Sequence, residues 1–242
     1  MKASNCLRLR NVINSESLSR FQYSLNTDVA SSRLKLASIL YWSGHFNAAL
    51  RVLEVVEKRY HRVVKDVCGI ILIEGDRDLQ VLANMLSGNK YKGFSELQFA
   101  FCVRFLREET YCVPCILLYE MKPNITEEEI AERHPVHKRW MDSAEVDARP
   151  SLNYLQCLTY GGIGGRDDQL RALDALRSNE YVAKIKINLY HQETALNMLG
   201  HCYEIEGEYD LALYYYEVSL SLCNPNNAAN WHLERILRLI GG

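Results

Sequence analysis

The chain has 242 residues, 48% of them hydrophobic and 24% charged, and a formal net charge of −2. This is the composition of an ordinary soluble protein, and the net charge gives no general reason to expect nucleic acid as a partner. No apolar stretch approaches the ~18–20 residues of a membrane span. The opening MKASNCLRLRNVINSES lacks the apolar core of a secretory signal, so we expect the eight cysteines to be reduced thiols in a cytoplasmic protein without membrane contact.

The charge is unevenly distributed along the chain. Residues 1–65 carry 11 Lys/Arg against 4 Asp/Glu, whereas residues 66–242 carry 17 against 26. Solvated helix faces explain such an excess in most proteins, so nucleic-acid binding through the basic N-terminal third is the less favoured interpretation.

A helical hairpin is predicted near the start of the chain, between residues 30 and 63. Within LKLASILYWSGHFNAALRVLEVVEKRYH, small, aromatic and glycine residues recur at the spacing of two helices joined by a tight turn. The residues that set this spacing are Ala37, Gly44, Phe46, Ala49 and Leu53. Asp28 is placed to cap the first helix.

The stretch from Leu97 to Phe105 is ambiguous. Its apolar residues alternate as in a strand, but together with Phe94 they also fit one helical face. Ser95 and Gln98 form a capping box, so we predict a helix here.

The sharpest chemical candidate is the Cys112-Val113-Pro114-Cys115 motif. A cysteine at a helix N-terminus has a lowered pKa, so a thiol-redox protein using Cys112 and Cys115 is one interpretation. The other is two packing cysteines beside a proline that sets a turn, and it is favoured because no βαβ pattern follows. Zinc is favoured less, since the spacing from this motif to His134 and His137 is irregular.

A degenerate second hairpin is predicted between residues 150 and 183. Its first helix is expected from Ser151 to Tyr160, followed by a long turn, Gly161–Asp167. Ala172 and Leu176 then keep the expected four-residue step. The glycines of the turn could suggest a phosphate-binding loop, but the Lys-Ser/Thr of a P-loop is absent and a helix precedes them.

The clearest unit lies between residues 193 and 226. In LNMLGHCYEIEGEYDLALYYYEVSLSLCNP, small residues stand where two helices approach and tyrosines fill the space around them. The pattern is carried by Gly200, Tyr203, Gly207, Tyr209, Ala212 and Tyr216. It resembles a tetratricopeptide repeat, a helix–turn–helix unit that buries its apolar side only against neighbouring units.

The end of the chain is predicted to be a capping helix over residues 227–240. Asn226 or Asn227 would start it and Gly241 would end it. Its apolar side is expected to comprise Ala229, Leu233, Ile236, Leu237 and Ile240. The opposite side would be polar, as a terminal helix of an array requires.

In tetratricopeptide-like arrays the first helix of each unit lines the concave, partner-binding side. By alignment, the partner-binding groove comprises Leu34, Ser38, Tyr41, Trp42, Asn197, His201, Glu204 and Ile205. Tyr41 and Trp42 are candidate anchors, since aromatic residues dominate binding hot spots, but they could equally pack on the neighbouring helix. No Lys or Arg accompanies Asn197, so the carboxylate clamp that binds chaperone tails is not expected.

Five stretches resemble a known group of proteins. They are FQYSLNTDVAS (21–31), VRFLREETYCVPCILLYEM (103–121), WMDSAEVDARPSLNYLQCLTYGG (140–162), LYHQETALNMLGHCYE (189–204) and NNAANWHLERIL (226–237). They resemble the C-terminal tetratricopeptide-like helical region of invertebrate Mab-type, cyclic GMP-AMP synthase-like nucleotidyltransferase-fold proteins. The resemblance implies a helical-repeat region, with the nucleotidyltransferase part lying before this sequence. No Gly-Ser followed by paired metal-binding carboxylates is found, so no catalytic residue is carried over.

The sequence therefore predicts an all-α, single-domain helical-repeat array over residues 1–242, with a capping helix. Its predicted function is that of a non-catalytic interaction or scaffold module for a protein or peptide, with no cofactor and no metal. The resemblance implies that it is the detached C-terminal region of a nucleotidyltransferase-like innate sensor. Thiol-redox chemistry and nucleic-acid binding stay as alternatives.

Overall fold

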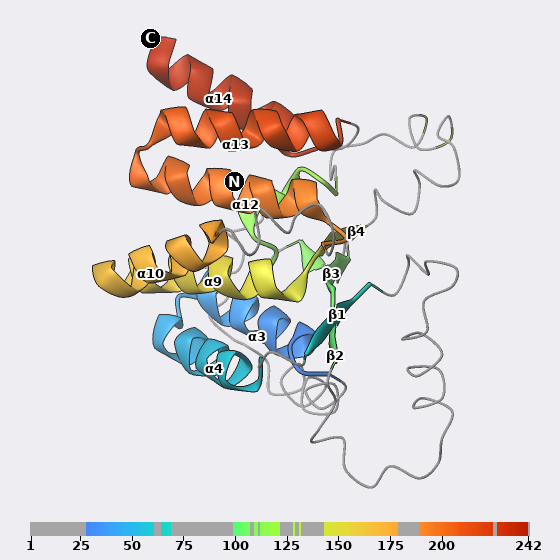
Figure 1. Ribbon diagram of the computed structural model, residues 1–242, viewed down its shortest axis with the longest axis vertical. Helices are drawn as coiled ribbons and strands as arrows, with labels where there is room; N and C mark the ends of the chain where they lie inside the picture. Colours follow the sequence, from blue (N-terminus) through green and yellow to red (C-terminus); the bar gives the residue numbers. More distant parts are fainter. Residues whose placement is uncertain are drawn as a thin grey trace, which may run out of the picture.

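The computed structural model describes residues 28–60, 64–68, 99–106, 109–110, 112–121, 128, 131, 143–178, 189–224 and 227–241. In these ranges the chain is mostly helical, with a few short strands (Figure 1). The elements are α3 (Ser31–Trp42), α4 (Phe46–Arg59), β1 (Lys65–Val67), β2 (Phe99–Phe101), β3 (Val103–Leu106), α6 (Cys115–Leu118), β4 (Ser143–Val146), α9 (Ala148–Ile163), α10 (Arg166–Arg177), α12 (Gln192–Glu206), α13 (Tyr209–Leu222) and α14 (Ala229–Gly241). None of these helices combines the length and apolar character that a membrane crossing needs.

Three helical hairpins, α3–α4, α9–α10 and α12–α13, form most of the described structure. Each turn contains one glycine with positive φ: Gly44 at 79°, Gly164 at 78° and Gly207 at 79°. A left-handed residue after the last helical turn reverses the chain at little steric cost only if it is glycine. All three hairpins therefore reverse direction at a glycine that can be recognised in the sequence.

The hairpins pack side by side in chain order, as Figure 1 shows. α9 lies in the middle, where it contacts α3, α4, α10 and α12. Its residues from Pro150 to Thr159 are all buried. At the C-terminal end, α13 packs between α12 and α14. One continuous core results, because each hairpin covers the apolar side of the next.

The closest helix approach in the last hairpin is the predicted one. A Cβ placed on Gly200 would lie 2.8 Å from Cε1 of Tyr216, whose ring is fully buried. Ala212, also fully buried, lies on the same helix as Tyr216. The small residues thus stand where they were expected, and the tyrosine fills the space that they leave.

The middle hairpin differs from its prediction. α9 continues to Ile163, so the turn is only Gly164 and Gly165 rather than a long loop. Counted from the turn glycine, the position of Ala212 is occupied here by Gln169 and not by Ala172. Gly161 lies inside the helix and lets Gln169 approach, since a Cβ there would be 2.9 Å from the Gln169 Nε2. Because four of the residues 161–165 are glycines, the sequence pattern does not show which one ends the helix.

The predicted helix over Leu97–Phe105 is wrong in its described part. β2 pairs in parallel with β1, and β3 pairs antiparallel with β4. Along β3, Val103 and Phe105 are buried while their neighbours are exposed, which is the period of a strand. Ladder partners from distant parts of the chain outweighed the local capping signal, whose residues Ser95 and Gln98 lie outside the described ranges.

The last helix begins as predicted but buries a different face. Asn227 Oδ1 accepts a hydrogen bond from the backbone N–H of Ala229 at 2.9 Å. The buried residues are Ala229, His232 and Ile236, whereas Leu237 and Ile240 are more than half exposed. The predicted polar outer face is therefore incorrect, because the helix is rotated to bring His232 inward.

Asp28 stands two residues before Ala30, the N-cap residue of α3. Its Oδ2 accepts hydrogen bonds from the backbone N–H of Ser31 at 2.9 Å and of Phe101 at 3.0 Å. One carboxylate therefore satisfies the start of α3 and anchors β2 beside it.

Candidate functional site

The side formed by the first helices of the hairpins carries a piece of the same chain. We call residues 109–110 and 112–121 the crossing segment, which includes α6. At one end it is held by α3, where Lys35 Nζ bonds Glu109 Oε2 at 2.8 Å and Ser38 Oγ donates to the Cys112 carbonyl at 2.5 Å.

The other part of the crossing segment is held by α12. Thr194 Oγ1 donates to Glu120 Oε1 at 3.2 Å, and Cys115 Sγ lies 3.5 Å from His201 Nε2. The segment thus spans from the first hairpin to the last, over the side where a partner-binding groove was predicted.

This covering decides what the predicted groove residues can do. Leu34, Ser38 and Asn197 are fully buried, so in this structure they cannot touch a partner. Asn197 Nδ2 instead donates to Asn227 Oδ1 at 2.8 Å. Ile205 is half exposed but does not line the cavity described below.

Tyr41, Trp42, His201 and Glu204 have more informative positions. The Tyr41 ring packs on Trp42 and Phe46, with centroids 5.1 and 5.3 Å away. Trp42 and His201 line a cavity, and Glu204 lies behind its wall as the partner of two lining residues. Two of the eight predicted residues are therefore brought together at one site.

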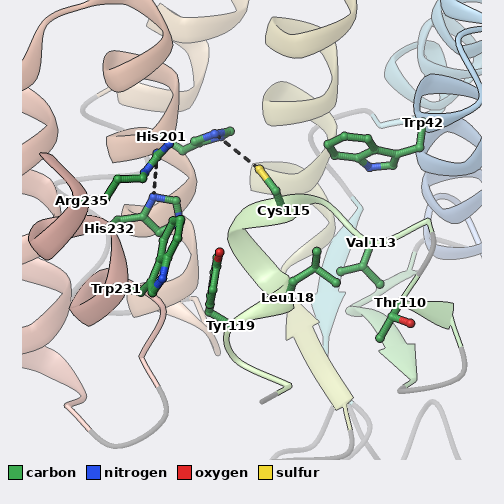
Figure 2. A pocket seen from close by; sticks show the side chains of 10 residues that line it. All are labelled: Trp42, Thr110, Val113, Cys115, Leu118, Tyr119, His201, Trp231, His232 and Arg235. Atoms are coloured by element: carbon green, nitrogen blue, oxygen red, sulfur yellow. Dashed lines mark hydrogen bonds between the residues drawn. The ribbon is translucent and has the colours of Figure 1, made fainter. Parts of the chain in front are cut away.

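The cavity has a volume of ≈ 250 Å³ and lies between α3, the crossing segment, α12 and α14. Its lining residues are Trp42, Thr110, Val113, Cys115, Leu118, Tyr119, His201, Trp231, His232 and Arg235. Figure 2 shows Trp42 on one side and the α14 residues on the other, with the crossing segment between them. Most of the lining is aromatic or aliphatic, with polar groups contributed mainly by α12 and α14.

A buried carboxylate orders the polar side of the cavity. Glu204 accepts from His232 Nδ1 at 3.2 Å, from the Tyr216 hydroxyl at 3.1 Å and from the Arg235 guanidinium. Burial alone would raise the pKa of Glu204, but the hydrogen bond to His232 and the charge of Arg235 outweigh it and lower that pKa. Arg235 also lies over the Trp231 ring, 5.1 Å from its centroid.

The Cys115–His201 pair is neutral. Burial raises the pKa of Cys115 to about 11, and burial together with the nearby His232 lowers the pKa of His201 to about 4. His201 Nδ1 lies 2.8 Å from the Tyr154 hydroxyl, which fixes the ring. Thiol and imidazole therefore do not form the thiolate–imidazolium pair of an activated cysteine.

The expected lowering of the thiol pKa in the CVPC motif is also absent at Cys112. Burial raises its pKa to about 12, and its Sγ donates to the Glu109 carbonyl at 3.1 Å. Pro114 precedes the short helix α6, so the motif does stand at a helix start, but desolvation outweighs the effect of one helical turn. Both cysteines are thiols in the structure.

Three cavity residues each hold a buried polar atom that has no hydrogen-bond partner within the described part of the chain. These atoms are Trp42 Nε1, His232 Nε2 and Arg235 Nε. An unpaired buried polar group costs ~1–3 kcal/mol, so such groups mark a place where a bound molecule gains by supplying partners.

Sequence reasoning missed most of the cavity wall. Tyr119 stacks on Trp231 with a centroid distance of 4.1 Å, and this contact joins two segments with no shared motif. His232 could have been found, because it stands three residues after Ala229 and four before Ile236, on the buried stripe of α14.

A group of potential metal ligands lies elsewhere in the described structure. Sγ of Cys68, Sγ of Cys102 and a ring nitrogen of His191 all lie within 4.8 Å of one another. None of these residues lines the cavity.

Comparison of the chain with protein-family models, with curated proteins and with solved structures gave no match.

Proposed function

We propose that this chain is a non-catalytic interaction module, built as a tetratricopeptide-like array of helical hairpins, that binds one anchor side chain of a protein partner in the cavity beside Trp42. The observation that carries the proposal is the position of the cavity, at the point where α3, α12, α14 and the crossing segment meet. Repeat arrays bind their partners on the side that the first helices form.

The helix packing supports the repeat arrangement. In an array, each unit leans on the unit before it. Here α9 packs against both helices of the preceding hairpin, α3 and α4, and α12 packs against α9 and α10. The same glycine turn recurs in all three hairpins, as expected for repeated units.

The size of the cavity favours an anchor site over a substrate site. Sites for small-molecule ligands usually measure about 300–1,000 Å³. A volume of ≈ 250 Å³ holds the equivalent of about eight waters at ~30 Å³ each, which is room for one bulky side chain. The neutral Cys115–His201 pair also offers no activated nucleophile.

The lining indicates what the anchor should be. Aromatic rings on opposite walls suit a large apolar side chain. Trp42 Nε1 and Arg235 Nε are donors without partners among the described residues, so a backbone carbonyl beside that side chain would be hydrogen-bonded. The proposed occupant is a peptide segment of a partner protein with one bulky apolar residue.

Affinity capture with the intact protein, followed by binding measurements on the purified partner, tests this proposal. Trp42→Ala should weaken the measured affinity at least about 30-fold, the effect of a ~2 kcal/mol hot spot. Leu170→Ala, at an exposed apolar position of α10 away from the cavity, is the matched control and should bind like the parent. A folded Tyr41/Trp42 double alanine variant with parental affinity would refute the proposal.

Thiol chemistry through Cys112 and Cys115 is the alternative with the more specific test. With pKa values raised to about 12 and about 11, both thiols should react with a maleimide at pH 7.5 far more slowly than the same cysteines in the unfolded chain. Peptide mapping after a timed pulse measures this. One cysteine of the pair reacting faster than in the unfolded chain would favour the thiol enzyme.

The remaining sequence-based proposals concern partners and origin. Nucleic-acid binding would use residues 1–65, of which 1–27 and 61–63 lie outside the described ranges. An affinity that falls steeply with added salt would support it. The relation to a nucleotidyltransferase-like innate sensor stays a proposal that rests on the five similar stretches.

A further inference from the structure

A second cluster of chemically active side chains lies where the short strands meet the starts of α9 and α12. Cys68 follows β1, Cys102 separates β2 from β3, Glu145 is in β4, and His191 directly precedes α12. Four segments that are distant in sequence therefore deliver two thiols, an imidazole and a carboxylate to one place.

Three distances within this cluster are those of a tetrahedral metal site. Cys68 Sγ lies 3.5 Å from His191 Nε2 and 3.6 Å from Glu145 Oε2, and His191 Nε2 lies 3.5 Å from the same carboxylate oxygen. Cys102 Sγ lies within 4.8 Å of Cys68 Sγ and of a His191 ring nitrogen, a group that does not include Glu145, and it also donates to Asp147 Oδ1 at 3.8 Å. Ligands at ~2.0–2.3 Å from a zinc ion in tetrahedral geometry are separated by roughly 3.3–3.8 Å.

We propose that Cys68, Cys102, His191 and Glu145 form a structural zinc site. Two sulfur ligands and one imidazole select zinc over the hard cations magnesium and calcium, which prefer oxygen. Binding releases to solvent the two thiol protons and the proton of the His191 imidazolium, so the occupied site holds Zn²⁺, two thiolates, a neutral imidazole and one carboxylate. The net charge of −1 is offset by Arg104, whose Nε lies 3.1 Å from Glu145 Oε1.

The surrounding structure holds the proposed ligands in place. Arg104 and Glu145 are directly paired residues of the β3–β4 ladder. The fully buried Asp147 accepts the backbone N–H of His191 at 2.9 Å, which fixes the start of α12. Glu193 Oε1 lies 3.9 Å from the other ring nitrogen, His191 Nδ1, which is close enough for an ion pair but longer than a hydrogen bond.

Burial favours a structural site over a catalytic one. Cys68 is 1% exposed and His191 is 5% exposed, so a substrate has little access to an ion between them. Zinc would tie β1, the β2–β3 junction and β4 to α12, joining the strands to the last hairpin. Structural zinc sites use four protein ligands. Cys68, Cys102 and His191 would supply three, and Glu145, which contacts Cys68 and His191, would supply the fourth.

The test uses the full chain, purified without a histidine tag. Zinc content by mass spectrometry should be one ion per chain after gel filtration. Replacement by cobalt should give a thiolate-to-cobalt charge-transfer band together with the intense visible bands of tetrahedral cobalt. Chelation should lower the melting temperature, and added zinc should restore it.

Variants assign the ligands. Cys68→Ser and Cys102→Ser should each abolish stoichiometric zinc, and Glu145→Gln should weaken zinc binding at least about tenfold. Cys223→Ser, a cysteine at the end of α13 outside the cluster, is the matched control and should keep one zinc. If a serine variant does not fold, the cobalt spectrum of the parent and the Glu145→Gln affinity decide the matter.

Three outcomes would overturn the proposal. The first is a parent protein that binds no zinc when metal-free and reduced. The second is a cobalt complex without a thiolate band. The third is a Cys68→Ser/Cys102→Ser double variant that folds and binds zinc as tightly as the parent does.

Discussion

Gly200 and Gly161 each lie inside a helix and in close contact with a side chain of a second helix, a buried ring in one case and an unbranched chain in the other. Substituting each glycine by alanine tests these helix contacts. A Cβ on Gly200 would lie 2.8 Å from a ring atom of Tyr216, and the fully buried ring has no room to move. Overpacking costs about 1–3 kcal/mol and alanine gains ~1 kcal/mol over glycine in a helix, so we expect Gly200→Ala to lower the free energy of unfolding by up to about 2 kcal/mol.

Gly161→Ala is the matched control for that substitution. Its Cβ would lie 2.9 Å from Nε2 of Gln169, the far end of an unbranched side chain, which donates to Glu206 Oε1 at 2.9 Å. Weakening that hydrogen bond costs about as much as the ~1 kcal/mol that alanine gains over glycine in a helix. We expect a change in unfolding free energy close to zero or slightly stabilising in urea denaturation. If both variants lose the same free energy of unfolding, the contact of residue 200 with Tyr216 is not tighter than that of residue 161 with Gln169.

His201 gives the protein a defined sensitivity to acid. Burial and the nearby His232 lower its pKa from 6.5 to about 4. Between these two pH values His201 is protonated in the unfolded chain and neutral in the folded chain. The stabilisation is complete above pH 6.5 and is lost as the pH falls toward 4. The difference corresponds to about 3 kcal/mol between pH 7 and pH 4.

Comparison with His201→Gln isolates this contribution from those of the neighbouring Glu204, His232 and Arg235. Urea denaturation at pH 7 and pH 4 should show the parent losing about 3 kcal/mol more than the variant. Cys115 and Tyr154 stay neutral in this range, since burial raises both pKa values. If the unfolding free energies of the parent and the variant depend equally on pH, His201 is not the group whose protonation destabilises the folded protein.

At the scale of elements, Asn227 connects α14 to the hairpin before it. Its Oδ1 accepts from Asn197 Nδ2 at 2.8 Å and from the N–H of Ala229, while its Nδ2 donates to Ser219 Oγ at 2.8 Å. Asn227→Ala would leave the buried Asn197 amide without this partner. We expect a loss of about 1–3 kcal/mol in unfolding free energy, measured by urea denaturation.

Asn230 provides the control for Asn227. It is exposed near the start of α14, and its Nδ2 has only long contacts, to Asn224 oxygens at 3.3–3.4 Å and to the Asn227 carbonyl at 3.5 Å. Asn230→Ala should change the unfolding free energy by less than about 0.5 kcal/mol. A similar loss in both variants would show that the helix start, rather than the buried amide network, is what matters.

The sequence predicted the hairpins because their signals are local. A turn glycine and the small residues around it lie within one unit, so Gly44, Gly207 and Ala212 could be interpreted without knowing any neighbour. The turn of the middle hairpin was predicted in the wrong place because several consecutive glycines could each form it. Only packing of α9 against α10 selects Gly164.

The strands and the sites could not be predicted in the same way. β3 exists because it pairs with β4, some forty residues later, and a local capping signal carries no information about that partner. The cavity joins α3 to α14, and His191 belongs to no spaced motif with Cys68 or Cys102. Residues brought together by three or four separate segments leave no periodic trace in the sequence.

At the scale of the whole molecule, the crossing segment changes how the hairpins depend on one another. In a simple repeat array each unit contacts only its neighbours, so the ends can unfold separately. Here the segment is bonded to Ser38 in the first hairpin and to Thr194 in the last. These contacts join residues 74 positions apart and give distant hairpins a common support.

Ala212→Trp separates the two kinds of behaviour. Ala212 is fully buried in α13, so a tryptophan there overpacks the last hairpin and costs about 1–3 kcal/mol or more. If the crossing segment couples the ends, hydrogen exchange should speed up in α3 as well as in α12–α14. Ala48→Trp, at a more exposed position of α4, serves as the control and should leave the exchange of α12 unchanged. Fast exchange confined to α12–α14 in the Ala212 variant would instead mean that the hairpins unfold one by one. The crossing segment would then not couple them, because coupled ends lose their protection from hydrogen exchange together.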